Sequence, residues 1–148
     1  ISSRDKRTNT ILKIAQKLKI DNINYKIFIF DNKYKIKENE LVTVIRKSVS
    51  LNEVNEYIEN SQILLDIQRK KQMGLTFRVF ESLGLQKKLI TSNEDVKNYD
   101  FYNPNNILII DVKNPVFPKS FFETPYQNIP DEILNKYLVE NWVECFLN

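Results

Sequence analysis

A chain of 148 residues fits one domain with a substantial hydrophobic core. Its 22 basic and 19 acidic residues leave a formal charge of +3, and they are too well mixed to form the concentrated basic face of a nucleic-acid-binding protein. Histidine is absent, one cysteine excludes an intrachain disulfide, and no D-x-D triplet occurs, so chemistry that needs a histidine base or a zinc cluster cannot reside here.

The sequence also indicates where the protein works. Cys145 stands within WVECFL, where we interpret it as a core residue, and a lone thiol fits a reducing compartment. No apolar run approaches the roughly 18–20 residues of a membrane span, and the N-terminus has no signal-peptide pattern. We expect a cytoplasmic protein whose membrane contact, if any, is peripheral at the inner face of the cytoplasmic membrane. Because the chain starts at Ile1 and its one methionine is Met73, we also expect an excerpt or a processed product.

The first predicted elements alternate between helix and strand. Apolar residues at helical spacing predict an amphipathic helix from Asp5 to Lys19. Two apolar runs, Tyr25–Phe30 and Leu41–Ile45, are typical of strands, and a polar excursion separates them. Ser50 and Glu53 match a capping box, which predicts a helix that runs to about Asn60.

The second half continues this alternation. Ile63–Ile67 is an almost continuous apolar run, as expected of a strand covered on both faces of a parallel sheet. The pattern then predicts, in order, a helix at Phe77–Gly84, a strand at Leu89–Thr91, a short helix from about Asn93 to Asn98, a strand at Ile107–Ile110, a proline-marked connection and a helix from about Asp131 to Leu147. Such alternation indicates one α/β domain over residues 1–148, a doubly wound, Rossmann-like parallel sheet with helices on both faces.

The segment after the strand at Ile63–Ile67 is polar and contains Gly74. Ligands of open α/β sheets bind at the carboxyl ends of the strands, and this turn should lie there. We expect Thr76 to cap the following helix, so that its first free N–H groups and the positive end of its dipole favour an anion.

A helical projection places the residues of the helix at Phe77–Gly84. It predicts that Arg78 and Ser82 face away from the sheet, and that Glu81 lies at the boundary between buried and exposed surface. The buried arc then holds Phe77, Val79, Phe80, Leu83 and Gly84. A carboxylate beside an anion-binding turn suits a phosphorylated, hydroxyl-bearing ligand. On spacing alone, Glu81 as a solvated residue and Gly74 as an ordinary turn glycine stay open.

Further charged residues stand where they could meet a ligand. Lys6 would lie near the first turn of a helix, where positive charge opposes the dipole unless an anion faces it, although a solvated basic turn remains an alternative. Arg46 follows the strand at Leu41–Ile45 directly. Asp66, amid apolar residues, needs a partner, and Arg78 or a lysine would be adequate.

The stretch MGLTFRVFESLGLQKKLI resembles the donor-site signature of the C-terminal domain of GT-B glycosyltransferases. More narrowly, LLDIQ, NYDFYNPNNILIID and NKYLVENWVECFL resemble bacterial glycosyltransferase-like proteins of capsular and lipopolysaccharide synthesis. The resemblance implies a hexose-transferring enzyme with a nucleotide-sugar donor, a saccharide or lipid-linked saccharide acceptor and no metal or other cofactor. It places Glu81 on the ribose hydroxyls, and the donor-binding residues that it further implies are Arg4, Lys6, Arg46, Gly74, Leu75 and Thr76.

The chain also departs from the family pattern. Met73, or Gln72 if the loop is shifted, stands in place of the family's first glutamate, and Gln86 and Lys88 replace a glycine and a proline. The acceptor site and the catalytic residues are expected in an N-terminal domain that this chain lacks. We therefore expect the chain to bind its donor without turning it over.

Two readings of another class stay open. Response-regulator receivers share the alternation of strands and helices, but they need an aspartate after the third strand, and Arg46 follows LVTVI here. A non-catalytic interaction domain that kept the fold is the other reading, and Met73 is the best argument for it. The donor base, the sugar, the acceptor and the stereochemical outcome cannot be read from the sequence.

Overall fold

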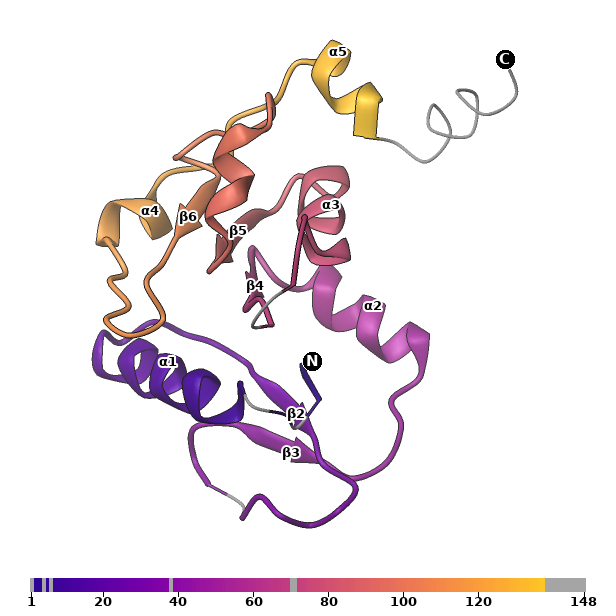
Figure 1. Ribbon diagram of the computed structural model, residues 1–148, viewed down its shortest axis with the longest axis vertical. Coiled ribbons are helices and arrows are strands. Elements are labelled where there is room, and N and C mark those ends of the chain that lie inside the picture. The colour runs from indigo at the N-terminus through magenta and orange to yellow at the C-terminus, as the bar shows by residue number, and fades with distance from the viewer. Residues whose placement is uncertain (1, 4, 6, 38, 70–71, 138–148) are drawn as a thin grey trace. The chain divides into compact units, whose positions relative to one another are not determined.

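The computed structural model describes residues 2–3, 5, 7–37, 39–69 and 72–137, and the chain divides into two compact units (Figure 1). The first unit consists of Ile1–Asn60 and Asp111–Phe117. The second consists of Ser61–Ile110 and Pro118–Asn148. Both units contain a parallel sheet, so the expected α/β class with parallel strands is confirmed.

The sheet of the first unit has three strands in the order β1-β2-β3, which are β1 (Ser2–Ser3), β2 (Phe28–Phe30) and β3 (Thr43–Ile45). In its parallel register Ile29 lies opposite both Ser2 and Val44. Helix α1 (Thr8–Ile20) connects β1 to β2 and buries the apolar stripe expected from its spacing, namely Ile11, Ile14, Ala15 and Leu18. Helix α2 (Leu51–Glu59) follows β3.

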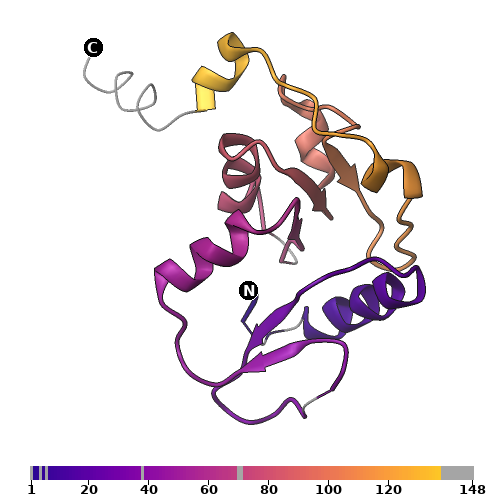
Figure 2. The ribbon, with the colours of Figure 1, turned by 180° about the vertical axis from the view of Figure 1, so that it is seen from behind.

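The sheet of the second unit has the order β4-β5-β6, with β4 (Ile63–Asp66), β5 (Lys88–Thr91) and β6 (Ile107–Ile109). Helix α3 (Phe77–Gly84) connects β4 to β5 and contacts both strands, and the 3-10 helix η1 (Glu94–Asn98) follows β5. Leu89, at the centre of the sheet, is fully buried. Beyond β6 the second unit contains α4 (Lys119–Glu123), α5 (Asp131–Leu134) and the 3-10 helix η2 (Asn135–Tyr137), which Figure 2 shows from behind.

Local sequence signals place several elements correctly. The capping box at α2 is confirmed: Ser50 Oγ accepts from the Glu53 N–H at 3.3 Å, and Glu53 Oε2 accepts from the Ser50 N–H at 2.9 Å. The bounds of α3 are those predicted. The predicted strand at Tyr25–Phe30 is shorter in the structure, because backbone pairing with β3 begins only where Thr43 N–H donates to Ile27 O at 2.9 Å.

Other elements differ from the expectation. Strand β1 was not predicted, because two residues are too few to show a strand pattern. Helix α4 was not predicted either, because the prolines around it indicated an extended connection. The last predicted helix is described only as far as Tyr137, and the rest of it lies outside the described residues.

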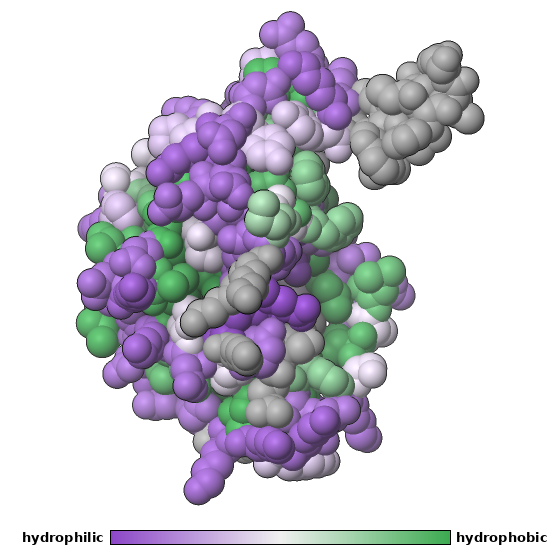
Figure 3. Space-filling view, viewed as in Figure 1, coloured by the Kyte–Doolittle hydropathy of each residue, from purple (hydrophilic) through white to green (hydrophobic). Residues whose placement is uncertain are grey.

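The surface is polar with scattered apolar side chains. Figure 3 shows hydrophilic and hydrophobic residues interspersed on the face that it draws. Two of the most exposed apolar side chains are Met73 and Phe77, whose exposed fractions are 88% and 78%. In the part of the chain that the structure describes, every helix is too short or too polar to cross a membrane.

Candidate functional site

The carboxyl edge of the sheet β4-β5-β6 begins with a buried polar pair. Asp66 ends β4 and Thr91 ends β5, and the two residues lie opposite each other in the parallel register. Thr91 Oγ1 donates to Asp66 Oδ2 at 3.0 Å, and both residues are buried. A buried carboxylate needs a partner, and here a hydroxyl provides it, so the expected pairing with Arg78 or a lysine is wrong.

The loop after β4 is held at both of the neighbouring strand ends. The carbonyl of Gly74 accepts from Asn93 Nδ2 at 2.9 Å and, at the longer distance of 3.4 Å, from Gln68 Nε2. Gln68 Nε2 also donates to Gln72 O at 2.9 Å, and the Gln68 N–H donates to Ser92 Oγ at 2.9 Å. The described parts of the loop, residues 67–69 and 72–76, are therefore fixed by hydrogen bonds to the ends of β4 and β5.

Gly74 has a φ of +72°, in the left-handed region that side chains disfavour. A Cβ built on Gly74 would meet no atom within 4 Å. The backbone conformation, and not a lack of space, is therefore what favours glycine here.

Helix α3 opens directly beside this loop. Thr76 occupies the predicted N-cap position with extended backbone angles, φ −85° and ψ 161°, but its side chain does not cap the helix. The carbonyl of Thr76 instead accepts from the Val79 N–H at 3.1 Å. Within the described part of the chain, Thr76 Oγ1 is the one buried side-chain oxygen that has no hydrogen-bond partner.

The buried face of α3 differs from the predicted one. The structure buries Val79, Ser82 and Leu83 and leaves Phe77 exposed, so the placement of Phe77 inside and Ser82 outside was wrong. Ser82 Oγ donates to Val79 O at 2.7 Å, which satisfies the hydroxyl within its own helix. A small, internally bonded serine can therefore lie on the face of α3 that contacts β4 and β5.

Glu81 already has a partner. Its Oε2 forms an ion pair with Arg78 Nη1 across one turn of α3, and the side chains are only 17% and 25% exposed. Glu81 is partly buried, as expected. Arg78, which was expected to face away from the sheet, pairs with Glu81 and is largely covered. A carboxylate has about four acceptor positions, so an arginine on one oxygen leaves acceptor capacity for ligand hydroxyls.

Arg46 belongs to the first unit, while Gly74, Leu75, Thr76 and Glu81 belong to the second. Arg46 Nη1 donates to the carbonyl and the carboxylate of Asp31 at 2.9 and 3.0 Å, and Nη2 donates to Ile36 O at 2.7 Å. The guanidinium also lies 4.8 Å from the ring centre of Tyr34. These contacts of Arg46 hold the loop after β2 against the end of β3.

Asp31 accepts hydrogen bonds both from Arg46 and from the backbone of this loop. It is buried, and its Oδ2 accepts from the N–H groups of Lys35 and Ile36 at 2.8 and 2.7 Å. Burial raises the pKa of Asp31, but the amide donors of Ile36, Lys35 and Lys33 and the guanidinium of Arg46 outweigh it and leave the pKa below its ordinary value.

Arg4 and Lys6, the expected diphosphate contacts, lie outside the described residues. Their neighbour Arg7 occupies the N-cap position of α1, where Nη2 meets Asp5 Oδ2 at 2.7 Å and the backbone N–H donates to Asp5 Oδ1 at 2.7 Å. The carboxylate of Asp5 thus offsets positive charge at the start of this helix without an external anion.

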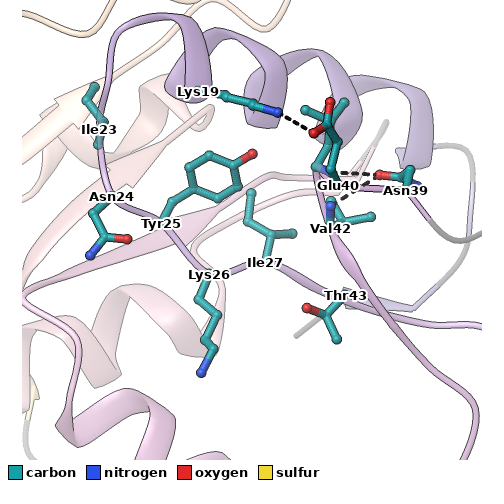
Figure 4. Close-up of a pocket in the computed structure, with 11 residues that line it drawn as sticks. Lys19, Ile23, Asn24, Tyr25, Lys26, Ile27, Asn39, Glu40, Val42 and Thr43 are labelled. Atoms are coloured by element: carbon teal, nitrogen blue, oxygen red, sulfur yellow. Dashed lines mark hydrogen bonds and ion pairs between the residues drawn. The ribbon is translucent and has the colours of Figure 1, made fainter.

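A hollow of about 530 Å³ lies in the first unit, at the amino-terminal side of β2 and β3 (Figure 4). Tyr25 and Ile27 line it, and Lys19 and Glu40 meet across it in an ion pair of 2.7 Å. Parallel sheets bind ligands at the opposite, carboxyl edge of their strands, so this hollow is not the candidate site.

The sequence analysis missed the roles of Asn93 and Gln68. Both follow the ends of neighbouring strands, and each carries an amide that can donate to a loop carbonyl. The signal was an amide side chain just past β4 and another just past β5. Asn93 was instead placed at the start of a short helix, and it does cap η1 by accepting from the Asp95 N–H at 3.0 Å.

Among the residues that the structure describes, no three histidine, cysteine, aspartate or glutamate side chains gather as metal ligands. Comparison of the chain with protein-family models, curated proteins and solved structures finds no match. The function must therefore be argued from the site itself.

Proposed function

We propose that this chain is the nucleotide-sugar-binding domain of a hexose-transferring glycosyltransferase that builds a bacterial surface polysaccharide or lipopolysaccharide. One observation carries the proposal: at the carboxyl edge of β4-β5-β6, Gly74 is hydrogen-bonded to Asn93 in a loop that leads into α3, and α3 presents Glu81 one turn from its start. This is the arrangement that the resemblance of MGLTFRVFESLGLQKKLI implies.

In this proposal the donor's diphosphate lies at the loop and at the start of α3. The amides near Gly74, Leu75 and Thr76 face its oxygens, and the positive end of the helix dipole adds to their effect. Arg4 and Lys6 supply further positive charge. These fixed charges stabilise the nucleoside diphosphate as it leaves the sugar.

Glu81 accepts hydrogen bonds from the ribose hydroxyls in the same proposal. Its ion pair with Arg78 restricts the rotamers of the carboxylate, so less side-chain entropy is lost on binding. Arg46 contributes through its main chain near the nucleotide base, because its guanidinium is already engaged by Asp31 and Ile36.

Each unit contains a parallel three-stranded sheet in which strands consecutive in the sequence are neighbours, as within each half of a Rossmann-type sheet. We propose that the chain is the C-terminal half of a GT-B fold, and that the acceptor site lies in a separate N-terminal domain.

Calorimetric titration with UDP, GDP, CDP and ADP, and with their sugar conjugates, tests the proposal. We expect weak binding of at least one nucleoside diphosphate, because these 148 residues would supply only one side of the donor's enclosure in a GT-B fold. Failure of the chain to bind any of these ligands at millimolar concentration would contradict the proposal.

That failure would instead favour a non-catalytic interaction domain. The observation behind this second candidate is the exposure of two large apolar side chains, Met73 in the loop and Phe77 at the start of α3. Met73 also stands where the family has a glutamate. Exposed apolar patches can mark a protein-binding surface.

A further inference from the structure

A continuous chain of hydrogen bonds connects the interior of the second unit to the loop. It begins at Asp66 Oδ2, which accepts from Thr91 Oγ1, and Thr91 Oγ1 in turn accepts from the Asn93 N–H at 3.1 Å. Asn93 Nδ2 then donates to the carbonyl of Gly74 at 2.9 Å. Asp66, Thr91 and Asn93 are buried, with exposed fractions of 7%, 0% and 2%.

Each group of Asn93 has a defined partner. Its Oδ1 accepts from the Asp95 N–H at 3.0 Å, so the orientation of the side-chain amide is fixed and Nδ2 must face the loop. A buried, fully bonded amide of this kind has little freedom to rotate. Gln68 approaches the same carbonyl of Gly74 from the end of β4.

The orientation of one peptide bond follows from these contacts. A trans peptide is planar, and its C=O and N–H groups point in opposite directions. The carbonyl of Gly74 points to Asn93, so the N–H of Leu75 must point away from Asn93 and from the buried hydrogen-bond chain. Within the described residues, no acceptor contacts the Leu75 N–H.

We propose that Asn93, assisted by Gln68, is a positioning residue that fixes the Gly74–Leu75 peptide and presents the Leu75 N–H to a phosphate oxygen of the nucleoside diphosphate. The inference rests on the proposed function and deepens it. Asn93 itself does not touch the ligand, since its amide is buried and already bonded on both sides.

The variant Asn93→Asp tests this role, because it keeps the acceptor for the Asp95 N–H and replaces the donor to the Gly74 carbonyl by a carboxylate oxygen that repels it. We expect the full chain to bind its preferred nucleoside diphosphate about tenfold more weakly, while the matching nucleoside changes by less than about twofold. A purely structural residue would weaken both ligands alike. Gln68→Glu should act in the same direction with a smaller effect, since its contact with Gly74 O is longer, and its half-buried position makes loss of folding less of a concern.

Asn106→Asp is the matched control. Asn106 is 1% exposed, donates from Nδ2 to Gln127 O at 2.7 Å and accepts at Oδ1 from the Gln127 N–H at 2.9 Å. It precedes β6 and so stands at the amino edge of the same sheet. This variant loses the same kind of bond, and we expect it to leave the ratio of diphosphate to nucleoside affinity unchanged.

The amide resonance of Leu75 in ¹⁵N–¹H spectra gives an independent readout. We expect it to move when nucleoside diphosphate is added to the wild type, and to differ between the ligand-free wild type and Asn93→Asp. If the wild type binds the nucleoside diphosphate and both loop variants keep its ratio of diphosphate to nucleoside affinity, the positioning role is wrong. The proposed function is then unaffected. If the wild type binds none of UDP, GDP, CDP and ADP, the proposed function fails and the contact with phosphate fails with it. The ligand-free spectra then still decide whether Asn93 orients the peptide.

Discussion

Glu81 shows how one residue can serve the helix and a ligand together. Its carboxylate pairs with Arg78 one turn earlier, in a geometry that is common on exposed helices. The same carboxylate stands one turn inside the helix that begins at the glycine loop. The structure therefore gives Glu81 a local partner without removing it from the candidate site.

We predict that Glu81→Ala weakens binding of the preferred nucleoside diphosphate by roughly 10- to 150-fold, the equivalent of about 1.5–3 kcal/mol for hydrogen bonds to a charged group. The free energy of unfolding should fall by only about 0.2–0.5 kcal/mol, the usual contribution of an ion pair between neighbouring turns. Calorimetry and thermal melting measure the two effects.

Arg78→Ala is the control for this variant, because it removes the same ion pair but leaves the carboxylate of Glu81. It should reproduce the small loss of stability with little loss of ligand affinity. A 2′,3′-dideoxy nucleotide should bind the wild type poorly and be nearly indifferent to Glu81→Ala. If both substitutions weaken the ligand equally, Glu81 acts through Arg78 and its assignment to the ribose is wrong.

Lys88 is a cation buried in the core of the second unit, with an exposed fraction of 4%. Its Nζ donates to Phe121 O at 2.7 Å and to Thr124 Oγ1 at 2.8 Å, and it lies 4.7 Å from the ring centre of Phe121. These contacts connect α4 and Thr124 to β5. Burial lowers the pKa of Lys88 below its ordinary value of 10.5.

We predict a characteristic pH dependence from this lysine. The folded state disfavours the charged form of Lys88. A charged Lys88 therefore lowers the stability of the protein at pH values below its folded pKa, and this destabilisation disappears as the pH rises toward 10.5. Stability of the wild type should therefore rise over that interval relative to Lys88→Met, as urea denaturation at successive pH values would show. Parallel pH profiles of the two proteins would contradict the prediction.

At the scale of elements, η2 contacts earlier parts of the second unit through the carboxylate of Asp100 and through aromatic rings. Asp100 accepts from Lys136 Nζ at 2.7 Å and from the Tyr137 hydroxyl at 2.6 Å. The ring of Tyr137 packs edge-on against Phe101 at 4.8 Å and lies 6.2 Å from the ring of Phe80 on α3. These contacts connect η2 to residues far from it in the sequence.

The same contacts predict a pH window for this attachment. Hydrogen bonds from Lys136 and Tyr137 lower the pKa of Asp100 below 3.8, so its contribution is present above 3.8 and is lost as the pH falls through the folded pKa. Burial, with the hydrogen bond to Asp100, raises the pKa of Tyr137 from 10.0 to about 12, so its contribution is present below pH 10 and is lost as the pH rises toward about 12.

We therefore expect the contacts that hold η2 to weaken as the pH falls below 3.8, and again as the pH rises from 10 toward about 12. Asp100 also raises the pKa of Lys136 above 10.5, so its ion pair with Lys136 is lost on the same alkaline side. The ring resonances of Tyr137 report the change, and Tyr137→Phe should reduce the alkaline transition to the part that belongs to Lys136 while keeping the aromatic packing. The acid transition should persist in that variant because Lys136 still meets Asp100. Detachment at neutral pH in wild type would show that other contacts decide the position of η2.

At the scale of the whole molecule, each of the two units holds some of the residues that the sequence resemblance assigns to the donor. Glu81 and the glycine loop belong to the second unit, whereas Arg4, Lys6 and Arg46 belong to the first. Ligand titration of charge variants is therefore the test of the residues in the first unit.

We predict that replacing both Arg4 and Lys6 by alanine weakens nucleoside diphosphate binding much more than nucleoside binding. Added salt should erode the difference between wild type and the double variant, because screening weakens contacts between exposed charges. Titrations at about 0.05 and 0.5 M salt measure this. Lys33 and Lys35 offer a control pair, since their replacement removes the same charge from the loop whose backbone contacts Asp31. Equal effects from the two pairs would assign the loss to net charge alone.

The sequence by itself determined the elements whose signals are local. The Ser50 and Glu53 capping box fixes the start of α2 within four residues, and the alternation of apolar runs and periodic helices indicates an α/β protein with parallel strands. The glycine at position 74 and the bounds of α3 were likewise readable, because turn preference and helix termination depend on neighbouring residues.

Only the tertiary structure decided which partner each polar side chain chooses. Asp66 pairs with Thr91, 25 residues away, although Arg78 or a lysine was the expected partner. The guanidinium of Arg46, which was expected at the donor, pairs with Asp31, 15 residues away. The buried face of α3 was decided in the same way, with Ser82 inside and Phe77 outside. These outcomes depend on the strand register and on packing between elements distant in sequence. A burial pattern along one helix constrains such contacts only weakly, because the position of the neighbouring strands, and not the helix alone, selects the face that is covered.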